Sequence, residues 1–105
     1  MKVKIGASID RCRPEILIAA ITVIDPIFNL YGEEAVITSG TEDCHHNAKR
    51  SRHYSGDALD FRHRFFDTDT KREILKELKK ELGGHFVVIL EKTHFHIHFA
   101  PVYGY

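Results

Sequence analysis

The stretch that decides the fold lies near the C-terminus and reads FVVIL-EKT-HFHIHF from Phe86 to Phe99. The apolar, partly β-branched run at 86–90 predicts a strand. After a tight connection at 91–93, histidines alternate with apolar residues, and this period of two predicts a second strand with one apolar face and one histidine face. The stretch therefore predicts two neighbouring strands of an antiparallel sheet.

Three further strands are expected upstream of this pair. Residues 58–62 read ALDFR, so Leu59 and Phe61 share a core-facing side. Residues 35–38 are short and β-branched between two glycines, which predicts a buried strand, and residues 2–5 fit a short edge strand.

Two helices complete the prediction. The first begins at Pro14, carries a broad apolar face, and is expected to kink or end near Pro26. The second follows a capping-box pattern at 70–73 and ends at Gly83-Gly84, with Lys71 and its neighbouring lysines on the solvent side. The order of elements predicts a single α+β domain over residues 1–105, with a mostly antiparallel sheet and helices on one face.

Composition narrows the function classes. Lys+Arg and Asp+Glu both number 15, so the formal net charge of zero argues against a nucleic-acid or membrane-surface role. Cys12 and Cys44 are too few for a disulfide scaffold; free thiols are the default, and one bridge stays open. The apolar run at 16–30 is too short and too polar to span a bilayer, and no signal peptide is recognisable. We expect a monomer that is cytoplasmic on synthesis.

Histidine usage is the unusual feature. The chain has eight histidines, all between positions 45 and 98. Clustered histidines indicate metal binding or acid–base chemistry. Several of them lie in the polar segment 40–55, which is predicted to be a long loop. Within this loop Cys44, His45 and His46 form a cluster that could be a second site, line a cleft, or simply be solvated.

A zinc site is the simplest chemistry that uses these residues. A catalytic zinc takes three His or carboxylate ligands, and His53 and Asp60 flank a glycine turn that lets them converge. His94, His96 and His98 share one face of a strand, about 6.5–7 Å apart, so one is expected to be a ligand and its neighbour to act on the reacting groups. Glu91 is the candidate general base that takes a proton from a zinc-activated water.

The motif around these residues resembles a known family. Ser51-x-His53-x-x-Gly56-x-Ala58-x-Asp60 is similar to the SxHxxGxAxD motif of the M15 metallopeptidases, which include D-alanyl-D-alanine carboxypeptidases and phage endolysins. His94-x-His96 resembles the HxH motif of the wider superfamily that also holds lysostaphin-type peptidases and the hedgehog signalling domain. The resemblance runs from about Val36 to Pro101 and implies a hedgehog/DD-peptidase-like fold.

The resemblance also implies roles. His53, Asp60 and His96 carry over as Zn²⁺ ligands, and His94 as an acid–base or transition-state group. Many M15 enzymes carry Glu-x-x-His instead, which Glu91-x-x-His94 also fits, so His94 is the alternative ligand. Where related small members often have an acidic residue, this chain has His98.

Substrate binding departs from the family pattern. The family usually places an arginine after the Ser-Gly of the lead-in strand to grip a substrate carboxylate, whereas this chain has Thr-Glu-Asp at 41–43. Ser51, Arg50 and Arg52 are the candidate substrate-binding residues instead, and an endopeptidase is as consistent with the pattern as a carboxypeptidase.

The resemblance thus implies a zinc peptidase acting on the peptides of bacterial peptidoglycan, either a phage-type lysin released to the cell wall or a cytoplasmic dipeptidase. The alternative is a metal-binding or structural module of the same fold that no longer cleaves peptides.

Overall fold

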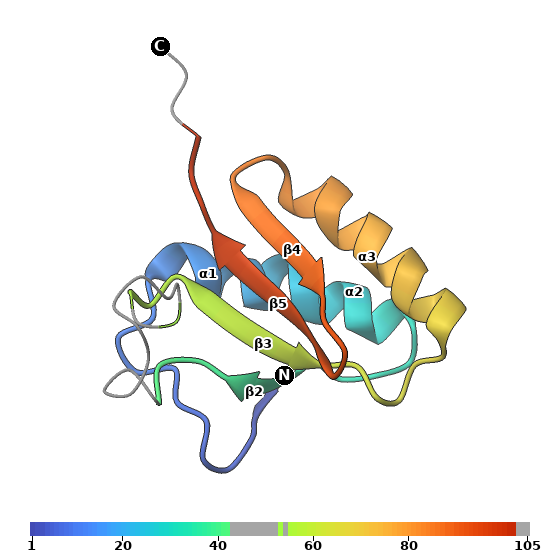
Figure 1. Cartoon of the computed structure of the whole chain (residues 1–105), viewed down its shortest axis with the longest axis horizontal. Coiled ribbons are helices and arrows are strands. Elements are labelled where there is room, and N and C mark those ends of the chain that lie inside the picture. Colours follow the sequence, from blue (N-terminus) through green and yellow to red (C-terminus); the bar gives the residue numbers. More distant parts are fainter. Residues whose placement is uncertain (43–52, 54, 103–105) are drawn as a thin grey trace.

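Five strands form one mixed sheet in the order β1-β2-β3-β5-β4 (Figure 1). The computed structural model describes residues 1–42, 53 and 55–102. Its strands are β1 (Lys2–Val3), β2 (Val36–Ser39), β3 (Ala58–Arg62), β4 (Phe86–Leu90) and β5 (His94–Phe99). Pairs β2–β3, β3–β5 and β4–β5 are antiparallel, whereas β1 runs parallel to β2. The predicted α+β class is confirmed, and the edge strand makes the sheet mixed.

The two faces of the sheet differ as the alternation predicts. Phe95 and Ile97 of β5 and Leu59 and Phe61 of β3 are fully buried on one face. The β5 histidines occupy the other face, where they remain partly exposed. Because strand residues alternate sides, a single strand both seals the core and presents imidazoles outward.

The N-terminal helical segment does not end at Pro26. It runs through α1 (Pro14–Ala19), a π-helical stretch η1 (Ala20–Ile24) and α2 (Asp25–Leu30). In the π-helical stretch the Asp25 N–H bonds back to the Ala20 carbonyl, a wider spacing than in an α-helix. Pro26 follows in the first turn of α2, where its missing N–H costs little. Of the two outcomes expected near Pro26, an end is wrong, and the irregular turn lies just before the proline, because the wider π-helical spacing accommodates it.

The C-terminal helix α3 (Thr68–Leu82) begins earlier than the capping-box pattern predicts. Its N-cap is Asp67, whose carboxylate accepts the Thr70 N–H at 2.7 Å. Thr70 therefore lies inside the first turn, because an aspartate is at least as good an N-cap acceptor as a threonine and its charge also suits the helix dipole.

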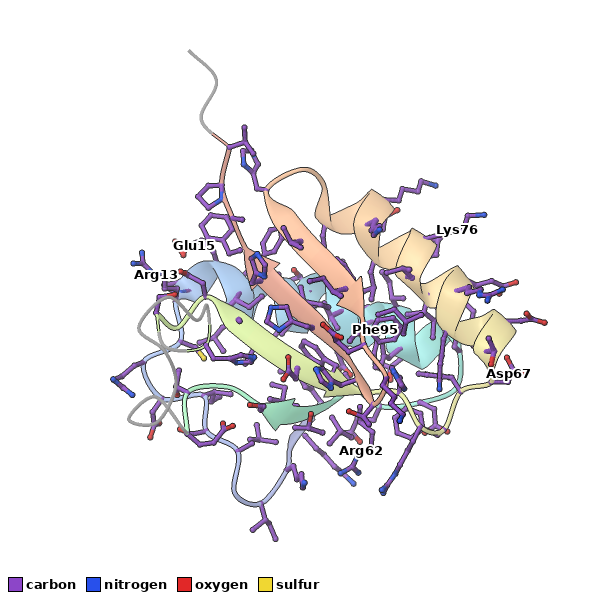
Figure 2. The ribbon with its side chains drawn as sticks, viewed as in Figure 1. Arg13, Glu15, Arg62, Asp67, Lys76 and Phe95 are labelled. Carbon is purple, nitrogen blue, oxygen red and sulfur yellow. The ribbon has the colours of Figure 1, made fainter. Side chains whose placement is uncertain are left out.

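Both helical segments pack on the apolar face of the sheet (Figure 2). Phe28 of α2 lies at the centre, with its ring making edge contacts to Phe61, Phe66 and Phe95 at centroid distances of 6.1, 5.5 and 5.9 Å. Ile74 and Leu78 of α3 join the same buried cluster. Within the described part of the chain, none of the helices has the length and apolar character needed to cross a bilayer.

Candidate metal centre

Three side chains predicted as zinc ligands meet on the open face of the sheet. One ligand atom from each of His53, Asp60 and His96 lies within 4.8 Å of the other two. Asp60 Oδ1 is 2.9 Å from His96 Nδ1 and 3.2 Å from His53 Nε2. Zinc bonds of 2.0–2.1 Å at tetrahedral angles separate donor atoms by about 3.3 Å. The donor types therefore suit a zinc ion, and the two distances to Asp60 Oδ1 are close to this separation.

Strand register brings two of the three together. Asp60 of β3 pairs with His96 of β5, and the flanking pairs are Ala58 with His98 and Arg62 with His94. Side chains directly opposite in antiparallel strands are about 5 Å apart at Cβ, which suits two ligands of one ion. This register favours His96 over His94 as the third ligand.

His53 reaches the centre from the segment before β3. Gly56, three residues later, has a φ of +80°, and its N–H bonds to the His53 carbonyl at 3.1 Å. A Cβ at Gly56 would lie 2.3 Å from the Arg11 carbonyl oxygen. The motif glycine is therefore required both by its left-handed backbone and by close packing against the N-terminal loop.

The carbonyl of Gly40 orients the His53 ring. His53 Nδ1 is 3.0 Å from this oxygen, which leaves Nε2 to face Asp60. Glu42 holds the Gly40 turn, because its carboxylate accepts the N–H groups of Gly40 at 2.7 Å and Ser8 at 2.9 Å, and the Ser39 hydroxyl at 2.6 Å. Metal-binding histidines usually have such an acceptor on the second ring nitrogen. Glu42 thus supports a predicted ligand through the Gly40 turn.

Electrostatics at the centre favour charged side chains. Burial lowers the pKa of His53, but the hydrogen bond and the charge of Asp60 outweigh it, so the pKa is raised overall. Burial raises the pKa of Asp60, yet hydrogen bonds from His53 and His96 and nearby imidazoles hold it well below its usual range. A metal ion bound between these groups would take the place of the hydrogen bonds that now join Asp60 to the two imidazoles.

His98 supports the third ligand. Its Nδ1 lies 2.9 Å from His96 Nε2, while His96 Nδ1 faces Asp60. A ligating histidine ordinarily donates its other ring N–H to an acceptor, and His98 offers a ring nitrogen in that place. His98 therefore stands where it can fix the orientation of the His96 ring.

His94 lies beside the centre without being part of the triad. Its Nε2 is 3.5 Å from Asp60 Oδ2, and its Nδ1 is hydrogen-bonded to the Thr93 hydroxyl at 2.9 Å. Its side chain is 28% exposed, twice the 14% of His53. An oriented and accessible imidazole next to a metal centre suits an acid–base role.

Glu91, the predicted general base, lies in the β4–β5 connection and is exposed. Its backbone N–H donates to the His94 carbonyl at 2.8 Å, and its own carbonyl accepts from His63 Nε2 at 2.7 Å. Its carboxylate has no hydrogen bond or ion pair with other described residues. Its catalytic role stays a prediction.

The remaining predicted residues fall elsewhere. Arg50, Ser51 and Arg52, and the Cys44-His45-His46 cluster, lie outside the described residues. Sequence reasoning missed three supporting residues, namely Gly40, Glu42 and Thr93. Gly40 and Glu42 come together with the site only through long-range hydrogen bonds, so no local pattern indicates them, whereas the position of Thr93 next to His94 is a signal that the sequence does offer.

Comparison with known proteins adds no relative. No protein-family model, no curated protein and no solved structure matches the chain. The candidate centre therefore rests on its motifs and on the geometry of His53, Asp60 and His96.

Proposed function

We propose that this chain is a zinc-dependent peptidase, of the hedgehog/DD-peptidase type, that hydrolyses peptide bonds of bacterial cell-wall peptidoglycan. The observation that carries the proposal is the convergence of His53, Asp60 and His96 within 4.8 Å. The motifs that resemble the M15 metallopeptidases contain these same three residues. The mixture of two imidazoles and one carboxylate is a common donor set of catalytic zinc.

Each residue of the centre has a separate role in the proposed reaction. His53, Asp60 and His96 would hold the metal, which when bound supplies Lewis-acid polarisation of a carbonyl and lowers the pKa of water to about 7. Glu91, at the start of the β4–β5 connection, takes a proton from the attacking water. His94, held by the Thr93 hydroxyl, donates a hydrogen bond to the developing oxyanion or a proton to the leaving amine.

A non-catalytic metal module is the second candidate. The observation in its favour is that the exposed Glu91 carboxylate makes no hydrogen bond or ion pair among the described residues, so nothing holds it toward the centre. In free enzymes, catalytic contacts often tighten only when substrate is bound, so activity of a Glu91 variant is the measurement that separates the two candidates.

The test combines metal analysis of the purified protein with mass spectrometry of digested peptidoglycan. We expect about one zinc per chain and new peptide termini in the digest, both retained by Glu81→Gln, an exposed α3 control. Glu91→Gln should keep the zinc and lose at least about 100-fold in rate, the scale of general-base catalysis. Zinc binding without detectable hydrolysis by the parent protein would favour the non-catalytic module, and absence of stoichiometric zinc would rule out both readings.

A further inference from the structure

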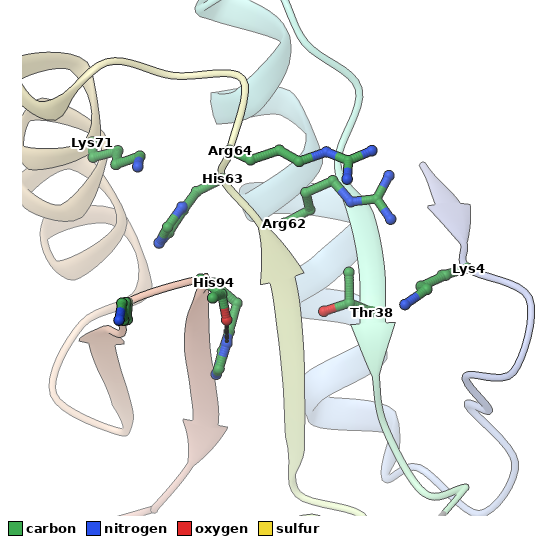
Figure 3. Close-up of a pocket in the computed structure, with 9 residues that line it drawn as sticks. Lys4, Thr38, Arg62, His63, Arg64, Lys71 and His94 are labelled. Carbon is green, nitrogen blue, oxygen red and sulfur yellow. Dashed lines mark hydrogen bonds between the residues drawn. The ribbon is translucent and has the colours of Figure 1, made fainter.

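A cationic cavity opens beside His94, at the end of the sheet where β3 stops and β5 starts (Figure 3). It measures about 480 Å³. Nine described residues line it: Lys4, Thr38, Arg62, His63, Arg64, Lys71, Lys92, Thr93 and His94. Five of these carry a positive side chain and none is acidic, which is a marked local excess in a chain with no net charge.

The cations come from separate parts of the fold. Arg62 and Arg64 extend from the end of β3 toward Lys4, while Lys71 of α3 lies on the other side, near His63 (Figure 3). None of the five forms an ion pair with a carboxylate in the described ranges. Like charges gathered around one cavity repel one another, so an anion bound there would stabilise the arrangement.

A buried histidine forms part of the cavity wall. His63 is only 2% exposed, and its Nε2 donates a hydrogen bond to the Glu91 carbonyl at 2.7 Å. Its Nδ1 is buried and has no hydrogen-bond partner among the described residues. His63 therefore gives the cavity its shape, whereas hydrogen bonds to an anion come from the guanidinium and ammonium groups.

The cavity adjoins the candidate metal centre. Arg62 lies two residues after Asp60 on the same face of β3, about 6.5–7 Å along the strand. It pairs across the sheet with His94, which contacts Asp60 on one side and lines the cavity on the other. Since an extended peptide advances about 3.3–3.6 Å per residue, a group at Arg62 lies within about two residues of a bond at the centre.

We propose that this cavity is a substrate subsite that binds an oxyanionic group, foremost a peptide carboxylate, within about two residues of the bond that is cleaved. That the bound group belongs to a substrate rests on the proposed peptidase function, whereas anion binding itself does not. Two arginines suit it, because a guanidinium binds a carboxylate or a phosphate through two parallel hydrogen bonds. The substrate class is then a peptide that carries a free carboxylate close to the bond that is cleaved.

The test measures anion binding by the full, zinc-loaded chain, without any need for hydrolysis. Glutarate, inorganic phosphate and the uncharged diamide of glutarate are titrated separately while backbone amide NMR signals are followed. We expect shifts at Arg62, Arg64 and His94 with either anion and none with the diamide. Tighter binding of glutarate identifies a carboxylate as the natural group, and tighter binding of phosphate identifies a phosphate ester.

Variants locate the site. The double variant Arg62→Gln, Arg64→Gln should weaken anion binding at least about 10-fold, the effect of losing charge-assisted hydrogen bonds. Lys76→Gln removes a charge from the same helix as Lys71 but outside the cavity, and it should change nothing. Equal binding by the double variant and the parent, or equal losses in the double variant and Lys76→Gln, would overturn the proposal. So would binding that requires zinc and ignores the arginines.

A second measurement separates this inference from the function it deepens. If peptides are cleaved, the double variant should raise KM for a peptide with a free carboxylate and leave KM for its amide unchanged. If the parent and the double variant cleave the peptide with the free carboxylate at the same KM, the subsite is excluded and the peptidase proposal remains. Anion binding without cleavage removes the peptidase and leaves an anion site beside a metal centre.

Discussion

Asp60 and His96 face one another across the β3–β5 register, with Asp60 Oδ1 2.9 Å from His96 Nδ1. The same oxygen lies 3.2 Å from His53 Nε2, so one carboxylate links two imidazoles that are 43 positions apart in the chain. Gly40 contacts the second ring nitrogen of His53, and His98 contacts that of His96.

Removal of a ligand should abolish tight metal binding. His53→Ala, Asp60→Asn and His96→Ala should each weaken zinc binding by at least about 100-fold, more than a supporting residue would. Zinc at 100 times its Kd should stabilise the parent by about 2.7 kcal/mol and these variants by much less. Calorimetric melting with and without zinc measures this. His85→Ala is the control, because the His85 side chain is exposed and accepts the Val102 N–H outside the candidate centre. A zinc response that survives in Asp60→Asn would contradict the centre.

Replacement of His98 should change the affinity for zinc without abolishing zinc binding. His98 Nδ1 lies 2.9 Å from His96 Nε2, so His98→Phe, which removes this partner, should weaken zinc binding about 10–100-fold. His98→Glu restores an acceptor with a negative charge and should bind zinc at least as tightly as the parent. Competition with a chromophoric chelator gives the three affinities. Identical affinities for the phenylalanine and glutamate variants would show that His98 does not support His96.

Loss of the Glu42 carboxylate should make the free energy of unfolding depend less on pH in the acid range. Although burial raises the pKa of Glu42, hydrogen bonds from Ser39, Ser8 and Gly40 lower it overall from its ordinary value of 4.5. A lowered pKa contributes stability that is present above pH 4.5 and is lost as the pH falls through the folded-state value.

Glu42→Gln should therefore cost about 1–3 kcal/mol of unfolding free energy at pH 7, and the difference from the parent should shrink below pH 4. Urea unfolding at several pH values measures it, with Glu81→Gln as an exposed control. A difference that does not vary with pH would show that shape, not charge, matters at this position.

The motif glycine should tolerate no side chain. Gly56→Ala places a Cβ 2.3 Å from the Arg11 carbonyl oxygen and imposes a left-handed backbone on alanine, so it should destabilise by more than the 1–3 kcal/mol of backbone strain alone. Gly84→Ala is the matched control, since a Cβ there meets nothing within 4 Å. Thermal melting compares the two. Equal melting temperatures would mean that the N-terminal loop moves aside freely.

Local patterns predicted much of this structure. The strands at 58–62, 86–90 and 94–99 and the buried side of each follow from alternation, because a strand must hide one face and expose the other. Helix boundaries were less predictable. The π-helical turn before Pro26 and the Asp67 cap depend on which of several acceptable local geometries packs best, and short sequence windows do not contain that information.

The sequence by itself determined the candidate ligands. Imidazoles and a carboxylate at fixed spacing around a glycine turn indicate a metal site. Only the tertiary structure favours His96 over His94, because that choice depends on the register of β3 against β5. It also places Glu42 behind a candidate ligand and gathers five cations around one cavity. These relationships join residues far apart in the chain. Local sequence patterns do not specify such contacts, because they depend on how the strands and loops pack together.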